Sequence, residues 1–443
     1  MDRRARVRFF LLVGLVLTLL LSSVASLALV RGASQAGESL SQIQRVMEIV
    51  SYVKSMYVDP VGATDLLRAY SEKGTIEGML ATLNDPYTRY LDPQAWEQVQ
   101  IETTGSFAGI GLWVAMSKDG EVTAVAAIPG TPAEEAGVLP GDVVLRIDDQ
   151  ETKGMSLDEA VHRIRGPEGT KVRLELKRKD VSQPIVVEIT RKLIHVPSVS
   201  GVSLLPGGVG YLRLMQFQEN SETELDQALA RLKQQGAKAI LLDLRFNPGG
   251  LLDTAVAVAS RFIETGPIVW QKSRNGREVV YAAWGRQAVV ANGGVPAYSE
   301  PMAVLVNGYS ASASEIVAGA LKDAGRATLV GTKTFGKGLI QTLIPLRSGG
   351  ALSLTTARYL TRGKHAIDKE GIKPDVEVPD PQPEAMAEYL GSDRPDLRDP
   401  QLRAAHELLL KKLVETGGSG AGTAATDASA ATGTEGAALE PAA

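Results

Sequence analysis

The chain contains 443 residues, of which 44% are hydrophobic and 22% charged, and at roughly 150 residues per domain this length indicates about three domains. The 47 basic and 51 acidic side chains leave a net charge of −4, which excludes the strongly basic surface of a dedicated nucleic-acid-binding protein. The absence of cysteine excludes disulfides and a cysteine nucleophile, and the four scattered histidines exclude histidine-rich metal motifs.

The first 30 residues have the composition of a membrane-targeting segment. Four arginines within residues 1–8 precede an uncharged run over residues 9–30, and at about 1.5 Å per residue this run spans roughly 33 Å, enough to cross a bilayer core. We therefore expect a cytoplasmic N-terminus and a single transmembrane anchor. The alternative is a signal peptide cleaved near Ala28 or Ala33, and both interpretations predict that the remaining chain is exported.

Residues 37–103 are expected to form a small helical domain. Apolar residues recur with helical spacing from Leu40 and Ile43 onward, and Asp92 and Pro93 are suited to cap and to begin a later helix. The apolar face of these helices could be an internal core or a contact between copies of the chain. The sequence leaves both alternatives open.

Residues 104–192 combine glycine turns with strand-like segments. Gly109, Ile110, Gly111 and Leu112 precede a strand-like run, and a helix is expected from Ser156 to Arg165. Consecutive glycines let backbone N–H groups converge on an anion, and the adjoining strand offers an edge to an extended peptide. This stretch resembles a PDZ domain, which implies that the four residues from Gly109 to Leu112 bind the C-terminal carboxylate of a substrate.

Arg165 lies at the predicted end of the PDZ helix, beside the expected peptide groove. An arginine there could simply complement the negative end of the helix dipole. It could also couple peptide binding to an active site elsewhere in the chain. We therefore treat it as a regulatory candidate.

Strand and helix patterns alternate over residues 193–378, which predicts an α/β core. Ala239 to Leu244 and Met302 to Val306 have the composition of buried strands, and Ser221 with Glu224 has the pattern of a capping box that opens a helix.

The end of the chain is divided into two parts. A helical segment is expected over residues 379–415, and residues 416–443 are mostly Gly, Ala, Ser and Thr, which predicts a disordered tail.

Three segments of the core carry residues suited to chemistry. They are the Asn-Pro-Gly-Gly turn over residues 247–250, the Ser-Ala-Ser-Ala-Ser run over 310–314, and Gly-Lys-Gly over 336–338. A serine where a strand meets a helix lies near free backbone N–H groups that can stabilise an oxyanion. Its hydroxyl needs a base, and since none of the segments contains histidine, a lysine made neutral by burial could serve.

The residues alone do not decide which side chains act. Ser310, Ser312 and Ser314 are equal candidates for the nucleophile, because capping a helix is the usual role of serine at such a place. Lys333 competes with Lys337 for the role of base, although the glycines on both sides of Lys337 permit a close backbone approach.

No metal, nucleotide or organic cofactor is expected. Gly331 to Lys337 begins like a phosphate-binding loop, but Gly338 stands where that loop needs Ser or Thr, and the residues that follow are strand-like. The isolated His365 is interpreted as a surface residue.

The order of these motifs, followed by Gln341, resembles the C-terminal processing (tail-specific) serine peptidases over about residues 40–378. The resemblance implies the following roles: nucleophile Ser312, general base Lys337, orienting residue Gln341, and oxyanion donors at the backbone N–H groups of Ala313 and Gly249. It also implies a ClpP/crotonase-like core. The predicted fold class is therefore multidomain α+β, with an N-terminal helical unit, a PDZ β-sandwich-like domain and an α/β peptidase core.

The predicted function is that of an exported serine endopeptidase that cleaves proteins near their C-termini. It would act on the extracytoplasmic side of a bacterial cell envelope, anchored to the inner membrane by residues 9–30. The expected partners are proteins with accessible C-termini, an adaptor protein and further copies of the chain, with no nucleic acid. The alternative is a catalytically silent PDZ scaffold that binds protein tails, which predicts that Ser312, Lys337 or Gln341 is missing, whereas all three are present.

Overall fold

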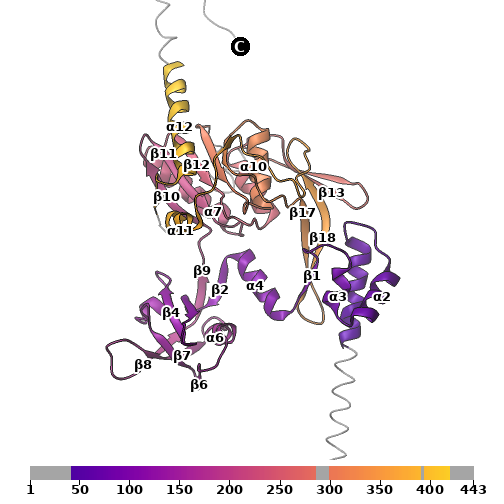
Figure 1. Ribbon diagram of the computed structural model, residues 1–443, viewed down its shortest axis with the longest axis vertical. Helices are drawn as coiled ribbons and strands as arrows, with labels where there is room; N and C mark the ends of the chain where they lie inside the picture. Colours follow the sequence, from indigo (N-terminus) through magenta and orange to yellow (C-terminus); the bar gives the residue numbers. More distant parts are fainter. Residues whose placement is uncertain (1–40, 286–298, 391–393, 420–443) are drawn as a thin grey trace, which may run out of the picture. The chain divides into compact units, whose positions relative to one another are not determined.

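The computed structural model describes residues 41–285, 299–390 and 394–419, and its helices and strands are labelled in Figure 1. The chain forms two compact units. The first contains the chain up to Ile194 together with Trp270–Tyr281 and Gly338–Leu360, and the second contains the remaining segments. The predicted core over residues 193–378 is thus divided between the units, because strands that are distant in sequence pair with N-terminal segments.

Some predictions concern residues outside the described ranges. These are the anchor over residues 9–30, the basic segment before it, and most of the tail over residues 416–443. Helix α12 (Pro400–Ser419) extends into the first residues of the predicted tail. Within the described ranges, no helix combines the length and the apolar character that a membrane span requires.

The N-terminal part of the first unit is helical, as expected. It contains a helix over residues 41–56, α2 (Ala63–Lys73), α3 (Ile76–Ala81) and α4 (Pro93–Thr104). The side chain of Asp92 accepts a hydrogen bond from the Ala95 N–H at 2.8 Å, and Pro93 occupies the first helical position, where its missing N–H costs nothing. The predicted cap is therefore confirmed.

These helices pack against an antiparallel sheet. Its strands are β1 (Arg89–Leu91), β13 (Pro267–Ser273), β14 (Glu278–Ala282), β17 (Leu339–Pro345) and β18 (Ala351–Leu360). Ile49 and Met79 of the helices are buried together with Leu354 of β18, so part of the apolar helical face is an internal core. Ile43 and Met47 remain 58% and 51% exposed, which leaves a second apolar strip on the first helix uncovered.

The PDZ part of the first unit is an antiparallel sheet with two short helices. Its elements are β3 (Leu112–Met116), β4 (Val122–Ala127), β5 (Val143–Ile147), β6 (Gln150–Glu151), β7 (Lys171–Lys177), β8 (Ile185–Thr190), α5 (Pro132–Glu135) and α6 (Leu157–Ile164). A separate ribbon pairs β2 (Ser106–Gly109) with β9 (Lys192–His195). Ser156 caps α6 by accepting a hydrogen bond from the Glu159 N–H, and Arg165 follows the last turn, as the sequence predicts.

The second unit is built around a six-stranded sheet. Its strands, in spatial order, are β10 (Val199–Leu205), β11 (Val209–Leu214), β12 (Ala239–Asp243), β15 (Met302–Val306), β16 (Thr328–Gly331) and β19 (Val376–Glu377). β10 and β11 are antiparallel, whereas every other neighbouring pair is parallel. All residues of β12 and β15 are buried, which is typical of central parallel strands covered on both faces.

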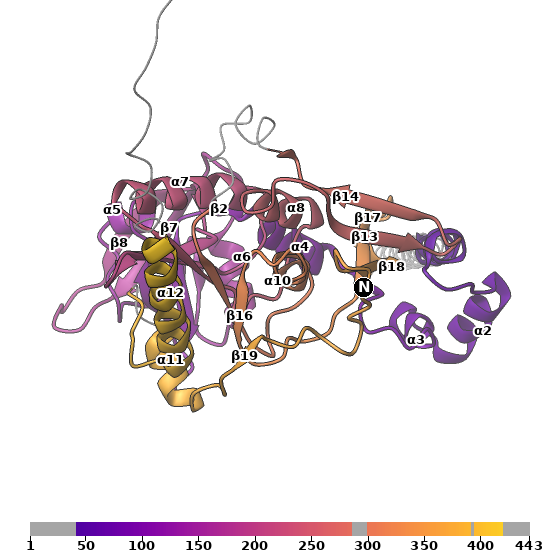
Figure 2. The same cartoon turned by 90° about the horizontal axis from the view of Figure 1, so that it is seen from above.

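Helices cover both faces of this sheet. They are α7 (Ser221–Gln234), α8 (Leu252–Ser260), α10 (Ala313–Asp323), α11 (Pro383–Leu390) and α12. Leu241 and Leu305 of the sheet are buried with Leu402 and Leu409 of α12. Successive strand residues point to opposite faces, and α12 and the pair α7 and α8 lie on opposite sides of the strands (Figure 2). The predicted α/β core is therefore a three-layer sandwich that includes the C-terminal helix.

The predicted capping box at the start of α7 is wrong. Asn220 is the residue before the helix, and Ser221 is already helical, with its hydroxyl accepting a hydrogen bond from the Gln218 N–H at 2.8 Å. Glu224 instead accepts hydrogen bonds from the N–H and the hydroxyl of Ser198, at 2.7 and 2.9 Å. The Ser221 hydroxyl is thus used by the preceding turn and the Glu224 carboxylate by the distant Ser198, so neither group is available for a capping box.

A buried ion-pair network fastens the end of β12 to the start of α12. Arg245 binds Asp243 through two nitrogens, with Nη2 2.7 Å from Oδ2, and its Nη1 lies 2.6 Å from Asp399 Oδ2. All three side chains are buried. Burial alone would raise the pKa of Asp243, but the charge of and hydrogen bonds from Arg245 hold it below its ordinary value.

Arg245→Met should lower the free energy of unfolding by about 3–5 kcal/mol, because Asp243 and Asp399 would be left buried without their cation. Guanidinium unfolding measures the loss, with Arg398→Met as the matched control, because Arg398 is an exposed arginine that also pairs with two carboxylates, those of Glu388 and Asp396. Acidification should recover part of the loss, since protonation removes the uncompensated charge. Equal stability of the two variants would contradict the role of the network.

Candidate active site

The three predicted motifs follow three neighbouring parallel strands. The Asn-Pro-Gly-Gly turn follows β12, the serine run follows β15, and the segment with Lys337 follows β16. Because parallel strands end at the same sheet edge, their following loops meet there. The Ala311 N–H donates to the Asn247 carbonyl at 3.0 Å, and the Phe335 N–H donates to the Ser310 carbonyl at 3.1 Å. The structure therefore brings the three segments together.

The three candidate serines differ in their surroundings. Ser310 is fully buried and its hydroxyl donates to the Leu244 carbonyl at 2.8 Å. Ser314 is also fully buried, and its hydroxyl donates to the Asn247 carbonyl at 2.9 Å. Ser312 is only half-buried. Two of the hydroxyls thus bind backbone carbonyls at or shortly before the first motif, and the third residue retains access to solvent.

Ser312 also has an unusual backbone conformation. Its φ of 55° and ψ of −115° place it in a region that L-residues rarely adopt, immediately before the first residue of α10. Such strain costs of order 1–3 kcal/mol and persists where the surrounding structure holds it, often at functional sites. A sharp turn between a strand and a helix is also the device that presents a nucleophilic serine in other hydrolases.

The Asn-Pro-Gly-Gly turn lies directly against this serine. A Cβ atom on Gly249 would come within 2.8 Å of Ser312 Cβ and 2.9 Å of the Ala313 nitrogen, so only glycine fits there. Ala313 is the first residue of α10, where a backbone N–H has no intrahelical acceptor. The Gly249 N–H, however, donates to Asn247 Oδ1 at 2.9 Å, so this predicted oxyanion donor would have to exchange that hydrogen bond to act.

Glu315 connects the serine to the lysine segment, a role that the sequence analysis did not assign. Its Oε2 accepts hydrogen bonds from the Ser312 N–H and the Lys337 N–H, both at 2.9 Å. Its Oε1 accepts from the Thr334 hydroxyl at 2.6 Å and the Gly336 N–H at 2.8 Å. The carboxylate is fully buried, and the four donors occupy both oxygens.

The electrostatics of Glu315 reflect this environment. Burial raises its pKa, although the four hydrogen bonds act in the opposite direction. The sequence does contain a signal for the residue, because Ser312 and Glu315 have the spacing of a capping box. The contacts with Thr334, Gly336 and Lys337 are non-local, and no local pattern predicts them.

The two candidate lysines and the glutamine are placed differently. Lys337 is half-buried, whereas Lys333 is exposed. Gln341 lies on β17 in the first compact unit, where its Nε2 is 3.2 Å from Thr355 Oγ1 on β18. The residues after Lys337 form strand β17 rather than a helix, in agreement with the rejection of a phosphate-binding loop. His365 is exposed, as expected.

The predicted carboxylate-binding loop is held tightly within the PDZ part. The Ile110 carbonyl accepts a hydrogen bond from the Ala133 N–H at 2.8 Å, and the side chain of Ile110 is buried. Gly111 has a φ of 74°, and a Cβ atom there would lie 2.4 Å from the side chain of Thr131. Gly109 ends β2 and Leu112 begins β3, so the loop connects the two strands.

Arg165 contacts two elements that precede the loop over residues 109–112, namely strand β2 and helix α4. Its guanidinium carbon lies 5.0 Å from the centre of the Phe107 ring, and Nη1 is 3.5 Å from Oε1 of Gln98 on α4. Burial lowers the pKa of Arg165, and the charge of Glu97 opposes this effect. A cavity of about 520 Å³ lies between α4 and α6, with Arg165 and His162 among its lining residues.

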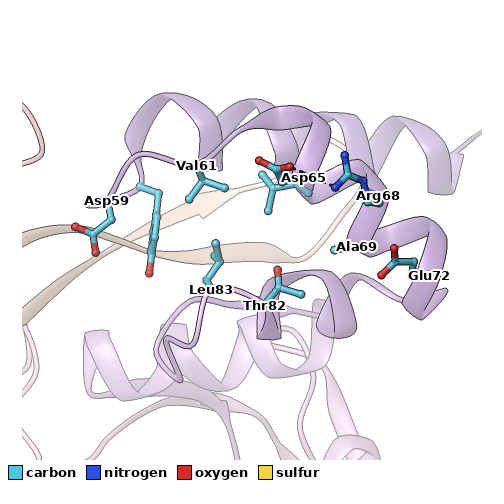
Figure 3. Close-up of a pocket in the computed structure, with 10 residues that line it drawn as sticks. Asp59, Val61, Asp65, Arg68, Ala69, Glu72, Thr82 and Leu83 are labelled. Carbon is cyan, nitrogen blue, oxygen red and sulfur yellow. Dashed lines mark ion pairs between the residues drawn. The ribbon is translucent and has the colours of Figure 1, made fainter.

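A second hollow, of about 370 Å³, occurs in the N-terminal helical part (Figure 3). Val61 and Leu83 line it together with the charged side chains of Asp65, Arg68 and Glu72. Asp65 and Arg68 are more than half exposed and lie 4.0 Å from each other. The charged groups are thus solvated, and we assign no ligand to this hollow.

Known protein families match three parts of the chain. Residues 20–95 match the activating protease CtpB N-terminal domain, residues 123–178 match the PDZ domain, and residues 208–378 match peptidase family S41.

Two curated relatives are similar over most of the chain. A carboxyl-terminal-processing protease of Synechocystis is 44% identical over 310 residues, or 69% of this chain and 70% of its own. A carboxy-terminal-processing protease of Bartonella bacilliformis is 40% identical over 352 residues, or 79% of this chain and 77% of its own. A solved photosystem II D1 C-terminal processing protease is 33% identical, with coverage of 80% of this chain and 98% of its own and a TM-score of 0.48.

A PDZ domain joined to an S41 core defines a serine peptidase with a peptide-binding module. The chain belongs to peptidase family S41, and its relatives there are carboxyl-terminal-processing proteases. The predicted family, the multidomain fold class and the assignment as a serine peptidase are therefore confirmed. The comparisons do not favour the alternative of a silent PDZ scaffold.

Glu315→Gln should lower kcat by about 100-fold, because an amide nitrogen cannot accept the hydrogen bonds that hold the serine and lysine segments in place. Each buried N–H left without an acceptor should also cost about 1–3 kcal/mol of stability. Protein cleavage and thermal unfolding are measured side by side, with the exposed Glu377→Gln as the matched control. Unchanged kcat in the Glu315 variant would show that the carboxylate does not position the site.

Proposed function

We propose that the protein is an endopeptidase that cleaves proteins near their C-termini, with Ser312 as nucleophile, Lys337 as general base and Gln341 as the residue that orients the lysine. The observation that carries this proposal is the shared carboxylate of Glu315, whose Oε2 accepts hydrogen bonds from the backbone N–H groups of both Ser312 and Lys337. The open position of Ser312, compared with the fully buried Ser310 and Ser314, supports the choice of nucleophile.

The reaction would pass through an acyl-enzyme. The neutral amine of Lys337 takes the proton of the Ser312 hydroxyl as Oγ attacks the substrate carbonyl carbon. The N–H groups of Ala313 and of the turn at Gly249 stabilise the negative oxygen of the tetrahedral intermediate. The intermediate collapses as Lys337 protonates the leaving amine. Lys337 then takes a proton from water as the hydroxide attacks the ester carbonyl. The bond between the acyl carbon and Ser312 Oγ breaks, and Lys337 returns the proton to Oγ, which regenerates both groups.

The PDZ part would select the substrate. In this proposal the loop over residues 109–112 binds the terminal carboxylate, and β3 adds the last residues of the substrate as a further strand. The tight packing of Gly111 against Thr131 supports a preformed loop. The substrates would therefore be proteins with accessible C-termini, captured at the tail and cut upstream of it.

The site of action would be the extracytoplasmic side of a bacterial envelope. The basic residues 1–8 and the apolar run over 9–30 support export, with the run either retained as an inner-membrane anchor or removed as a signal. The exposed strip of Ile43 and Met47 on the first helix would mediate contact with another copy of the chain or with an adaptor protein.

Ser312→Ala should abolish cleavage of an unstructured protein with an apolar C-terminus, with a fall in kcat of about 10³-fold or more. Lys337→Ala should have a similar effect, while Ser310→Ala and Lys333→Ala serve as comparisons for the competing assignments. Product formation is followed by gel electrophoresis and mass spectrometry. Residual activity of Ser312→Ala equal to that of the wild type would overturn the assignment and revive the scaffold alternative.

Arg165→Ala should reduce the stimulation of cleavage by an added apolar tail peptide, because Arg165 contacts both the strand that leads into the carboxylate loop and helix α4. The ratio of peptide-stimulated to basal cleavage and the Kd of the peptide are measured together. The exposed Arg173→Ala in the same PDZ part is the control. An unchanged ratio with unchanged Kd would mean that Arg165 only ends its helix.

A further inference from the structure

Each of the three motif segments carries one aromatic residue that the catalytic proposal does not use. Phe246 precedes the Asn-Pro-Gly-Gly turn, Tyr309 stands three residues before Ser312, and Phe335 stands two residues before Lys337. Tyr309 and Phe335 are 65% and 55% exposed. We call Phe246, Tyr309 and Phe335 the aromatic rim.

The rim is an ordered structure. The rings of Phe246 and Tyr309 are stacked, with centroids 5.0 Å apart and an angle of 17° between their planes. The backbone of Phe335 is fixed next to this pair. Its N–H donates to the carbonyl of Ser310, the residue after Tyr309, at 3.1 Å. The rim therefore borders the segment that carries Ser312.

Asn307 holds the stacked pair in place. Its side-chain oxygen accepts hydrogen bonds from the Phe246 N–H and the Tyr309 N–H, both at 3.1 Å, so the orientation of the amide is set by two donors. Asn307 is fully buried, and within the described ranges its Nδ2 makes no hydrogen bond. A buried donor without an acceptor is rare in native proteins and costs stability.

The backbone beneath the rim is strained as well. Phe246 has a φ of 60°, a conformation that bulky residues seldom adopt. The strained Phe246 is half-buried and stacks under Tyr309, and the rings of Tyr309 and Phe335 remain exposed. Structural packing would instead bury these two rings, since burial of apolar surface is what stabilises a fold. Strain of this kind is retained at functional sites.

We infer that the aromatic rim is a substrate subsite, which accepts an apolar side chain of the polypeptide next to the bond that is cleaved. The inference rests on the proposed function of Ser312. The rim is continuous with the segments that carry the nucleophile and the base, so a chain bound for cleavage passes over it. Exposed aromatic faces offer a large apolar contact and no charge to pair with a charged side chain.

The experiment compares where wild-type and variant proteins cut one unfolded protein, such as casein, with the cleavage sites and their rates identified by mass spectrometry. The wild type should favour Leu, Ile, Phe or Met beside the cleaved bond. Tyr309→Ala and Phe335→Ala should each lower the rate at those sites by about 10- to 100-fold and leave sites flanked by Gly or Ser within about threefold. Tyr309→Phe should retain the wild-type preference, because it keeps the ring.

Two controls separate the rim from the catalytic proposal. A fluorophosphonate probe should label the wild type and the rim variants equally but not Ser312→Ala, which shows that the nucleophile is intact when only the preference changes. Val414→Ala removes an apolar side chain that is 75% exposed on α12 and should change nothing. Cleavage and labelling by Ser312→Ala would instead overturn the catalytic proposal itself.

Three results would overturn the inference. One is an unchanged preference in both alanine variants, and another is an equal loss at apolar and non-apolar sites, which a structural role would produce. The third is a change in oligomeric state, measured by light scattering, that accounts for the loss, because the rim would then be a contact between copies of the chain.

Discussion

The candidate active site depends on one buried carboxylate. Glu315 accepts a hydrogen bond from the backbone of Ser312 and others from the segment that ends at Lys337, so both catalytic candidates are placed by the same group. Burial of a carboxylate is costly unless its oxygens are satisfied, and here four donors satisfy them. The position of the carboxylate in turn fixes the positions of its four donors, because all four must lie within hydrogen-bond distance of its oxygens. The positions of the surrounding segments therefore follow from the need to satisfy the buried Glu315 carboxylate with hydrogen bonds from the protein.

A second constraint comes from the parallel sheet. The strands β12, β15 and β16 are neighbours, so three motifs that are separated by tens of residues in sequence meet at one edge. The Arg245 network extends this arrangement, because it fastens the end of β12 to Asp399 before α12. The loops of the candidate active site therefore follow strands that are held in place by buried charges as well as by apolar packing.

The sequence predictions are accurate where a feature depends on neighbouring residues and fail where it depends on residues that are distant in sequence. The strands Val209–Leu214 and Met302–Val306 and the cap at Asp92 were predictable, because strand burial and helix capping depend on neighbouring residues. The capping box at Ser221 failed because Glu224 binds the distant Ser198. The pairing of β1 with β18 could not be predicted from local patterns, since the two strands are distant in sequence.

The sequence by itself determined the classes of residue available for chemistry, the order of the motifs and the family to which they belong. Those features reside in residue identity and local spacing. Only the tertiary structure decided that Ser310 and Ser314 are fully buried, with their hydroxyls bonded to backbone carbonyls, while Ser312 is half-buried at a strained turn. It also decided that the Glu315 carboxylate accepts hydrogen bonds from the backbone N–H groups of both Ser312 and Lys337, the proposed nucleophile and base. Burial and non-local hydrogen bonds distinguish the three chemically identical serines, and neither property can be predicted from the local sequence.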